Sequence, residues 1–274
     1  NAAYEVIAGK GATNYAVGLA VARIVESIRR DENRVLPIST LLQDWHGITD
    51  VCMSVPTLVN ARGAEFRNLG LVDLNVTMSP DGGEAVGGFA GTCNNTILRN
   101  CYATGVVTGV AGRWDGAYAG GLVGEAIEGA LIERCSFVGQ VTFTLPSPSY
   151  FMDGVGGLAG YLNASTIRSS YARGVVGNGE DCAFPLGGFV GISASGGAPL
   201  ISECYTATRV DVWNWLDLTQ MCQFMGVRGS ASVTNCYVDW EVNGTPDIQL
   251  IGSHGWSGGI NKTNTAAMKT QSTY

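Results

Sequence analysis

The sequence predicts a mainly β protein: a parallel β-solenoid of about five to six coils, preceded by an α/β fragment made of a helix and a hairpin. Two recurring phrases and a shift in composition near residue 62 support this prediction. The first phrase is Gly-Gly-apolar-apolar-Gly, with copies at 87–91, 120–124, 156–160 and 187–191. Their first glycines lie 33, 36 and 31 residues apart, a period typical of stacked structural units.

The second phrase reads apolar-x-x-Cys-Tyr-apolar and recurs once in each repeat. Its copies begin at Leu98, Ile132, Ile167, Ile201 and Val233, and a valine follows nine residues after each. Short strands separated by glycine turns at a constant spacing are what a parallel β-solenoid requires. We therefore expect these two rows to face inward. We expect the glycine doublets to line one edge, where positive φ and close backbone approach favour glycine, with one of the two following apolar residues inside.

Composition divides the chain at the same place. Residues 1–62 contain six Lys+Arg and six Asp+Glu, whereas residues 63–274 contain ten and seventeen, so the formal charge of −7 arises in the second part. An acidic repeat without a basic stripe excludes nucleic-acid binding that depends on phosphate neutralisation. No apolar run is long enough to cross a bilayer, so we expect no transmembrane segment. We divide the chain into 1–62, the solenoid at 63–243, and a Gly/Ser/Thr-rich connector at 244–274.

Half of the eight cysteines share one position of the repeat, which Ser170 also occupies. These cysteines are Cys101, Cys135, Cys204 and Cys236. A column of small residues suits the packed interior of a stack, because free cysteine packs as a small hydrophobe. We expect reduced thiols in the core. The alternative is a pair of disulfides, Cys101–Cys135 and Cys204–Cys236.

The first segment predicts a helix from Thr13 to about Arg30 and two strands at 34–42 and 48–55. The residues expected on the buried face of the helix share helical spacing and are Val17, Val21, Ile24 and Ile28. We expect this segment to stay ordered by docking on the first coil, as a cap over the open end of the stack.

Three phrases in this segment, at 9–18, 31–40 and 50–56, closely resemble the substrate domain of bacterial L-lactate dehydrogenase. The resemblance implies that Thr13 borders the substrate pocket and that Val17 packs on the nicotinamide of NAD. The family's catalytic histidine, its orienting carboxylate, its substrate-binding arginine and its dinucleotide fingerprint fall outside the resembling segment. We therefore expect no hydride transfer by this chain alone.

The glycine repeat resembles the GLUG repeat of bacterial surface proteins and adhesins, over roughly residues 64–242. The resemblance implies a secreted or cell-surface β-solenoid, with further repeats or domains beyond both ends. The leading hypothesis is therefore a non-enzymatic, adhesin-like protein that binds glycan or protein ligands without a cofactor. The alternative is a truncated L-lactate dehydrogenase-like oxidoreductase fragment, inactive alone and cytoplasmic. A third alternative is that the join near Arg62 is an accident of sequence assembly.

Two groups of loop residues are candidate binding sites. The aromatic group, Tyr150, Phe151, Trp213 and Trp215, lies in irregular insertions and suits either ligand binding or a lid over the solenoid. The acidic group precedes the glycine doublets and consists of Asp81, Asp115 and Asp153. Asp-Gly is first of all a turn-former, so we rank calcium binding and paired-carboxylate glycoside cleavage below a turn role.

Overall fold

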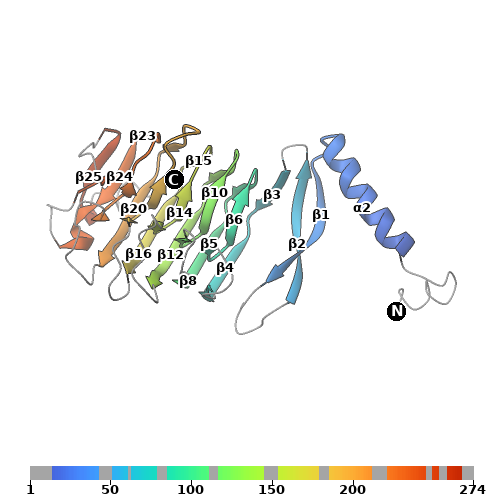
Figure 1. Ribbon diagram of the computed structural model, residues 1–274, viewed down its shortest axis with the longest axis horizontal. Helices are drawn as coiled ribbons and strands as arrows, with labels where there is room; N and C mark the ends of the chain where they lie inside the picture. Colours follow the sequence, from blue (N-terminus) through green and yellow to red (C-terminus); the bar gives the residue numbers. More distant parts are fainter. Residues whose placement is uncertain are drawn as a thin grey trace.

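In the computed structural model the chain forms a rod of stacked coils, with a hairpin and a helix at its N-terminal end (Figure 1). The structure describes residues 14–42, 51–60, 63–78, 85–110, 117–144, 154–178, 185–211, 221–244, 249–252 and 258–266. The architecture is mainly β and its solenoid ladders are parallel, which confirms the predicted fold class. The solenoid makes about four turns, fewer than predicted.

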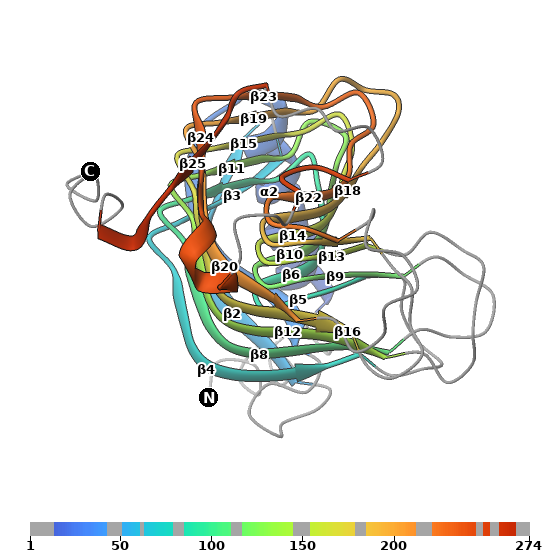
Figure 2. The same cartoon turned by 90° about the vertical axis from the view of Figure 1, so that its left-hand side faces the viewer.

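Four sheets run along the rod, and successive coils superpose when it is viewed end on (Figure 2). The junction sheet contains, in order, β1 (Arg34–Leu42), β2 (Val51–Asn60), β3 (Gly63–Arg67), β7 (Ile97–Arg99), β11 (Leu131–Glu133), β15 (Thr166–Arg168), β19 (Leu200–Ser202) and β23 (Ser232–Thr234). The long sheet contains β4 (Gly70–Thr77), β8 (Tyr102–Val110), β12 (Ser136–Thr144), β16 (Tyr171–Asn178), β20 (Tyr205–Asp211), β24 (Cys236–Asp239) and β25 (Ile260–Thr263).

The two remaining sheets are short and meet at the glycine doublets. One contains β5 (Ala85–Gly87), β9 (Tyr118–Gly120), β13 (Gly154–Gly156), β17 (Leu186–Gly187) and β21 (Met221–Cys222). The other contains β6 (Ala90–Asn94), β10 (Val123–Ile127), β14 (Ala159–Leu162), β18 (Val190–Ser193) and β22 (Met225–Val227). Each coil therefore passes from the first short sheet through a glycine corner to the second, then to the junction sheet and the long sheet.

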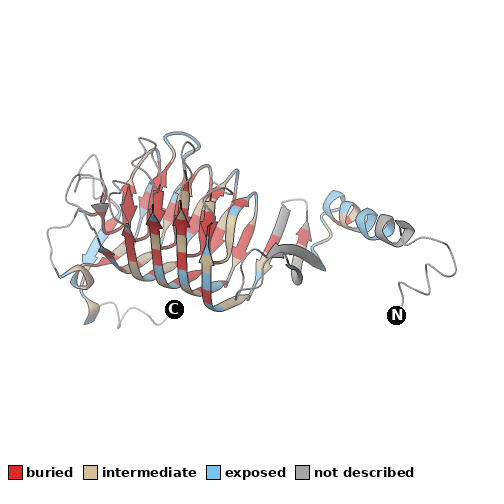
Figure 3. Cartoon of the chain, turned by 60° about the horizontal axis from the view of Figure 1, so that its bottom comes forward, coloured by how far each residue is buried: buried red, intermediate tan, exposed pale blue. Residues whose placement is uncertain are grey.

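The inward rows predicted from the repeat form the core (Figure 3). Leu98 and Val107 of one coil stack on Ile132 and Val141 of the next, and all four side chains are fully buried. The last pair departs from the pattern, because Val242 lies in the 3-10 helix η2 (Trp240–Asn243). The sequence alone did not reveal that η2, capped by the Asp239 side chain, replaces the end of the last long strand.

The glycine doublets line up along a single edge, as predicted, but not for both of the expected reasons. None of the described doublet glycines has positive φ. Close backbone approach is the reason for glycine: a Cβ on Gly121 would overlap the Gly157 carbonyl, and one on Gly157 would overlap the Gly188 carbonyl. Both apolar residues that follow are core residues in most coils, as Leu122 and Val123 show, and not one of the two as expected.

The N-terminal segment forms the predicted elements but not the predicted packing. Helix α2 (Asn14–Arg29) packs on β2, and β1 pairs antiparallel with β2. The helical face expected to be buried is largely exposed, since Val21 is 53% and Ile28 41% exposed. Ser27 is buried instead, with its hydroxyl bonded to the Arg23 carbonyl. The buried side of the helix is therefore the one that carries Ser27, whose hydroxyl has a hydrogen-bond partner within the helix.

The hairpin extends one of the four sheets of the solenoid, the junction sheet. Strand β2 pairs antiparallel with β3, which pairs in parallel with β7, so the hairpin continues the junction sheet. Among the described strands, β4, β5 and β6 are the first members of the other three sheets. The predicted cap is therefore partial: it covers the junction-sheet edge.

Candidate functional site

The side chains singled out from the sequence fall outside the described residues. They are Thr13, Asp81, Asp115, Tyr150, Phe151, Asp153, Trp213 and Trp215. Val17 belongs to α2, but its side chain is likewise outside the described set. Their roles in substrate, calcium and ligand binding stay predictions. The described residues offer three other candidates: an ion-pair ladder, a thiol column and an open cleft.

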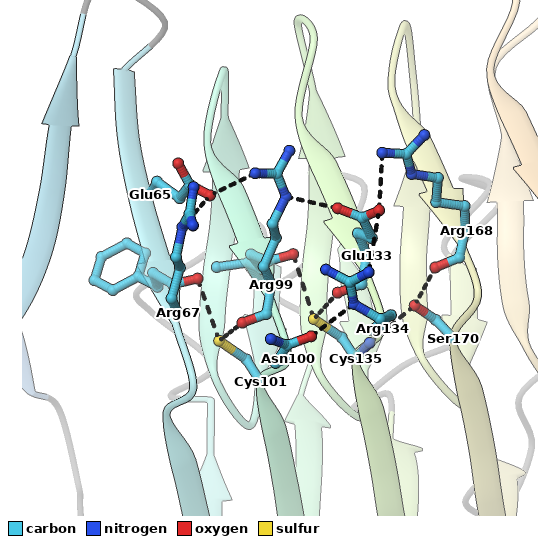
Figure 4. Close-up of polar contacts among 12 residues, drawn as sticks. Glu65, Arg67, Arg99, Asn100, Cys101, Glu133, Arg134, Cys135, Arg168 and Ser170 are labelled. Carbon is cyan, nitrogen blue, oxygen red and sulfur yellow. Dashed lines mark hydrogen bonds and ion pairs between the residues drawn. The ribbon is translucent and has the colours of Figure 1, made fainter. Parts of the chain in front are cut away.

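The ion-pair ladder runs along the junction sheet where the hairpin meets the solenoid (Figure 4). Glu65 Oε1 accepts hydrogen bonds from Arg67 Nε at 2.6 Å and from Arg99 at 3.0 Å. Arg99 Nε also donates to Glu133 Oε2 at 2.6 Å, and an Arg168 nitrogen lies 2.8 Å from Glu133 Oε1. Parallel register places Arg99, Glu133 and Arg168 on neighbouring strands. Opposite charges therefore alternate along this sheet.

Both glutamates of the ladder are buried. Glu65 is 1% exposed, and its Oε2 has no hydrogen-bond partner among the described residues. Burial alone would raise the pKa of Glu133, but the hydrogen bond from Arg99 and the charges of Arg168, Arg99 and Arg134 hold it below its ordinary value. A carboxylate kept ionised in this way is a poor general acid at neutral pH. The ladder therefore links β3, β7, β11 and β15 through paired charges.

A polar column at the neighbouring corner was not anticipated from the sequence. The residue before each position of the cysteine column has φ between 49° and 56°. These residues are Asn68, Asn100, Arg134, Ser169, Glu203 and Asn235. The Asn100 amide donates to Asn68 Oδ1 at 2.9 Å, and Arg134 Nε donates to Asn100 Oδ1 at 2.7 Å. The available signal was the run of polar residues at one repeat position, three of them asparagine, which tolerates left-handed backbone.

The thiol column lies inside that corner. The six described cysteines are unbridged and buried, as the reduced-core prediction requires. Cys101 and Cys135 lie in neighbouring coils, and the Ser136 amide donates to the Cys101 carbonyl at 3.0 Å. Ser170 continues the column, its hydroxyl accepting from the Cys135 amide at 3.0 Å.

The open cleft has a volume of about 730 Å³ and lies on the short sheets. Tyr118 and Tyr161 stack at its side with ring centroids 4.6 Å apart, and Asn163 and Ser195 contribute polar atoms. Burial raises the pKa of Tyr161, and the charge of Glu125 adds to this effect. No charged side chain is among the lining residues. The cleft can therefore provide ring contacts and hydrogen bonds, but it has no acid–base pair.

The described residues do not form a site for a metal or a dinucleotide. They contain no group of three or more His, Cys, Asp or Glu placed to hold a metal ion. A dinucleotide site needs a glycine-rich turn between a strand and a helix of a βαβ unit. In the described part of the chain the parallel strands are connected by corners and further strands, and α2 is followed by an antiparallel hairpin. The described residues thus contain no dinucleotide-binding turn of this kind, and we derive no step through NAD.

No helix among the described residues is both long and apolar enough to span a membrane.

Comparison with known proteins shows similarity in the first part of the chain. Residues 1–79 match the family described as lactate/malate dehydrogenase, alpha/beta C-terminal domain. The L-lactate dehydrogenase of Bifidobacterium animalis subsp. lactis is 60% identical over 67 residues, which cover 24% of this chain and 21% of that enzyme. The enzyme of Acetivibrio thermocellus is 60% identical over 65 residues, covering 24% of this chain and 20% of that enzyme. The chain thus spans about a fifth of the length of the curated relatives it matches.

These findings correct the leading functional hypothesis. The prediction of a non-enzymatic surface adhesin is wrong: the family match and relatives at 51–60% identity favour the dehydrogenase alternative. The GLUG resemblance and a secreted or cell-surface location receive no support from these comparisons. The match covers α2, the hairpin, β3 and β4, and so extends beyond the boundary predicted at residue 62.

Proposed function

We propose that this chain is a dehydrogenase-related protein in which the N-terminal segment supplies part of the substrate domain of an L-lactate dehydrogenase-type oxidoreductase, with the β-solenoid appended as a rigid module. The identity of 60% over 67 residues to the Bifidobacterium enzyme carries this proposal. The segment also forms the expected local elements, since α2 begins at Asn14, one residue after Thr13.

In this proposal Thr13 borders the substrate pocket and Val17 faces the nicotinamide, as the family resemblance implies. A reaction that moves a hydride and a proton needs an acid–base group positioned at the substrate oxygen. The matched segment contributes pocket residues and not that group, so the chain is inactive by itself. The remaining parts of the catalytic machinery come from the portion of a dehydrogenase that the match does not cover.

The buried carboxylate of Glu133 is paired with Arg99 and Arg168, which suits a structural part of the solenoid better than acid–base chemistry. We assign the solenoid a structural role as a spacer or scaffold beside the dehydrogenase segment. We keep the proposed division at residue 62, because the parallel ladder begins with the pairing of β3 and β7. The six described cysteines are unbridged, which is typical of a reducing compartment and supports placing the protein in the cytoplasm.

A hybrid enzyme tests the proposal. The part of the Bifidobacterium L-lactate dehydrogenase that precedes its matched residues is joined to the full chain, and pyruvate-dependent NADH oxidation is measured. We expect turnover by the hybrid and none by the chain alone. Thr13→Ala in the hybrid should lower kcat/KM, whereas the exposed change Glu128→Gln should leave it unchanged. A hybrid that folds and binds NADH but does not reduce pyruvate would contradict the proposal.

A further inference from the structure

Two pairs of stacked thiols have no part in the proposed function. Cys101 and Cys135 lie in adjacent coils, as do Cys204 and Cys236, because β8 pairs with β12 and β20 with β24 in parallel register. Neighbouring strands are about 4.8 Å apart. That separation falls in the range of roughly 4.4–6.8 Å between Cα atoms that a disulfide requires. The backbone can therefore accept a bridge in each pair without moving far.

The second sulfur of each pair points toward the coil that holds the first. Cys135 Sγ lies 3.4 Å from the carbonyl oxygen of Leu98, in the coil of Cys101. Cys236 Sγ lies 3.9 Å from the carbonyl oxygen of Ile201, in the coil of Cys204. The thiols of each pair also interact with each other, which lowers the pKa of Cys101 and of Cys236.

We propose that Cys101–Cys135 and Cys204–Cys236 are oxidation sites at which hydrogen peroxide closes a disulfide between adjacent coils. In the first step a thiolate attacks one peroxide oxygen, the O–O bond breaks, and the leaving hydroxide takes up a proton to give water. The product is a sulfenic acid. In the second step the partner sulfur attacks the sulfenic sulfur, the S–O bond breaks, and hydroxide leaves with the partner's proton as a second water. Two electrons pass from the sulfurs to the peroxide.

Either thiol of a pair can make the first attack, because the two cysteines hold equivalent positions in adjacent coils. All four cysteines are at most 1% exposed, so peroxide reaches them when the stack opens locally. The disulfide then closes a loop of more than thirty residues in each case.

The test is peroxide treatment of the folded full-length chain, followed by peptide mapping without reductant. We expect two cross-linked peptides, one for each pair, and their loss after dithiothreitol. Closing such loops should raise the Tm by roughly 5–10 °C. Cys135→Ser should abolish the first link and leave the second, and Cys236→Ser should do the reverse. Serine suits these positions because Ser170 already occupies the same column.

Three outcomes would overturn the proposal. The first is a folded protein that does not react although the urea-unfolded chain does, which would make these thiols inert core residues. The second is oxidation to sulfinic acid without a link. The third is a bridge from Cys101 to Cys93, whose buried thiol also interacts electrostatically with Cys101. Circular dichroism of each serine variant confirms that a missing link does not reflect misfolding.

Discussion

The solenoid and the helix–hairpin segment bury their apolar side chains to very different extents. Leu98, Ile132 and Ile167 of the solenoid are fully buried, whereas Val21 and Val25 of α2 are 53% and 56% exposed. Each inward side chain of the solenoid is covered by the equivalent side chains of the coils before and after it. Among the described elements, the helix packs on β2 of the hairpin. A repeat supplies its own packing partners along the chain, and a segment shared with a much larger enzyme does not.

The largest expected effect is at a glycine corner. Gly157→Ala should destabilise the chain by about 3 kcal/mol or more, because the new Cβ would overlap the Gly188 backbone carbonyl, which cannot move independently of its coil. Gly196→Ala is the matched control, with no atom within 4 Å of its Cβ, and should change stability by less than about 0.5 kcal/mol. Urea unfolding measures both. Equal effects would show that the coils are not closely stacked there.

Truncating an apolar side chain should also destabilise the protein far more in the solenoid than in the helix. Ile132→Ala removes a fully buried side chain and should cost about 3 kcal/mol. Val25→Ala, on the exposed side of α2, should cost less than about 0.5 kcal/mol. Thermal and urea unfolding of both variants would test this difference. A loss of several kcal/mol from Val25→Ala would mean that the helix face is covered.

The ion-pair ladder should give a smaller, pH-dependent effect. The folded-state pKa of Glu133 is lowered, so its contribution to stability is present above its ordinary pKa of 4.5 and is lost as the pH falls through the folded value. Glu133→Gln should cost about 1–2 kcal/mol at pH 7, because it removes the carboxylate that pairs with both Arg99 and Arg168 and leaves Arg99 with Glu65 alone. This cost should shrink in acid. Glu128→Gln is the exposed control. If both variants showed the same dependence of the free energy of unfolding on pH, the ion pairs of Glu133 would not contribute to stability.

The smallest effect is expected for the ion pair on α2. Arg30 and Glu26 lie 2.8 Å apart at i,i+4 spacing, and both side chains are largely exposed. Glu26→Gln should therefore change the free energy of unfolding by only about 0.3 kcal/mol, and less in high salt. We therefore expect Glu26→Gln to lower the free energy of unfolding less than Glu133→Gln does. A larger decrease for Glu26→Gln would contradict the contrast between the two regions.

Repeat spacing was sufficient to predict the parallel stack, its inward rows and its reduced cysteine column. It succeeded because residues such as Leu98 and Ile132 must superpose when coils have nearly equal length. The sequence predicted two reasons for the glycine doublets, positive φ and close backbone approach, and only the second was confirmed. Positive φ belongs instead to the polar residue before each cysteine, such as Asn100.

Features that depend on register between coils were missed. Arg99, Glu133 and Arg168 occupy the same repeat position, and their alternating charge was a signal that could have predicted the ladder. The exposure of α2 could not be predicted from its apolar spacing. That spacing shows which face is apolar, but burial depends on what packs against it. The similarity to known proteins followed the short specific phrases at the N-terminus and not the longer repeat.

Hydrogen exchange of the intact chain, followed by mass spectrometry, tests the contrast most directly. Amides of β8, β12 and β16 lie in the middle of the long sheet and should exchange only on global unfolding. Amides of α2 should exchange orders of magnitude faster, because the helix can open while the solenoid stays folded. Equal protection of α2 and β12 would contradict the account, since it would mean that helix and solenoid unfold as one cooperative unit.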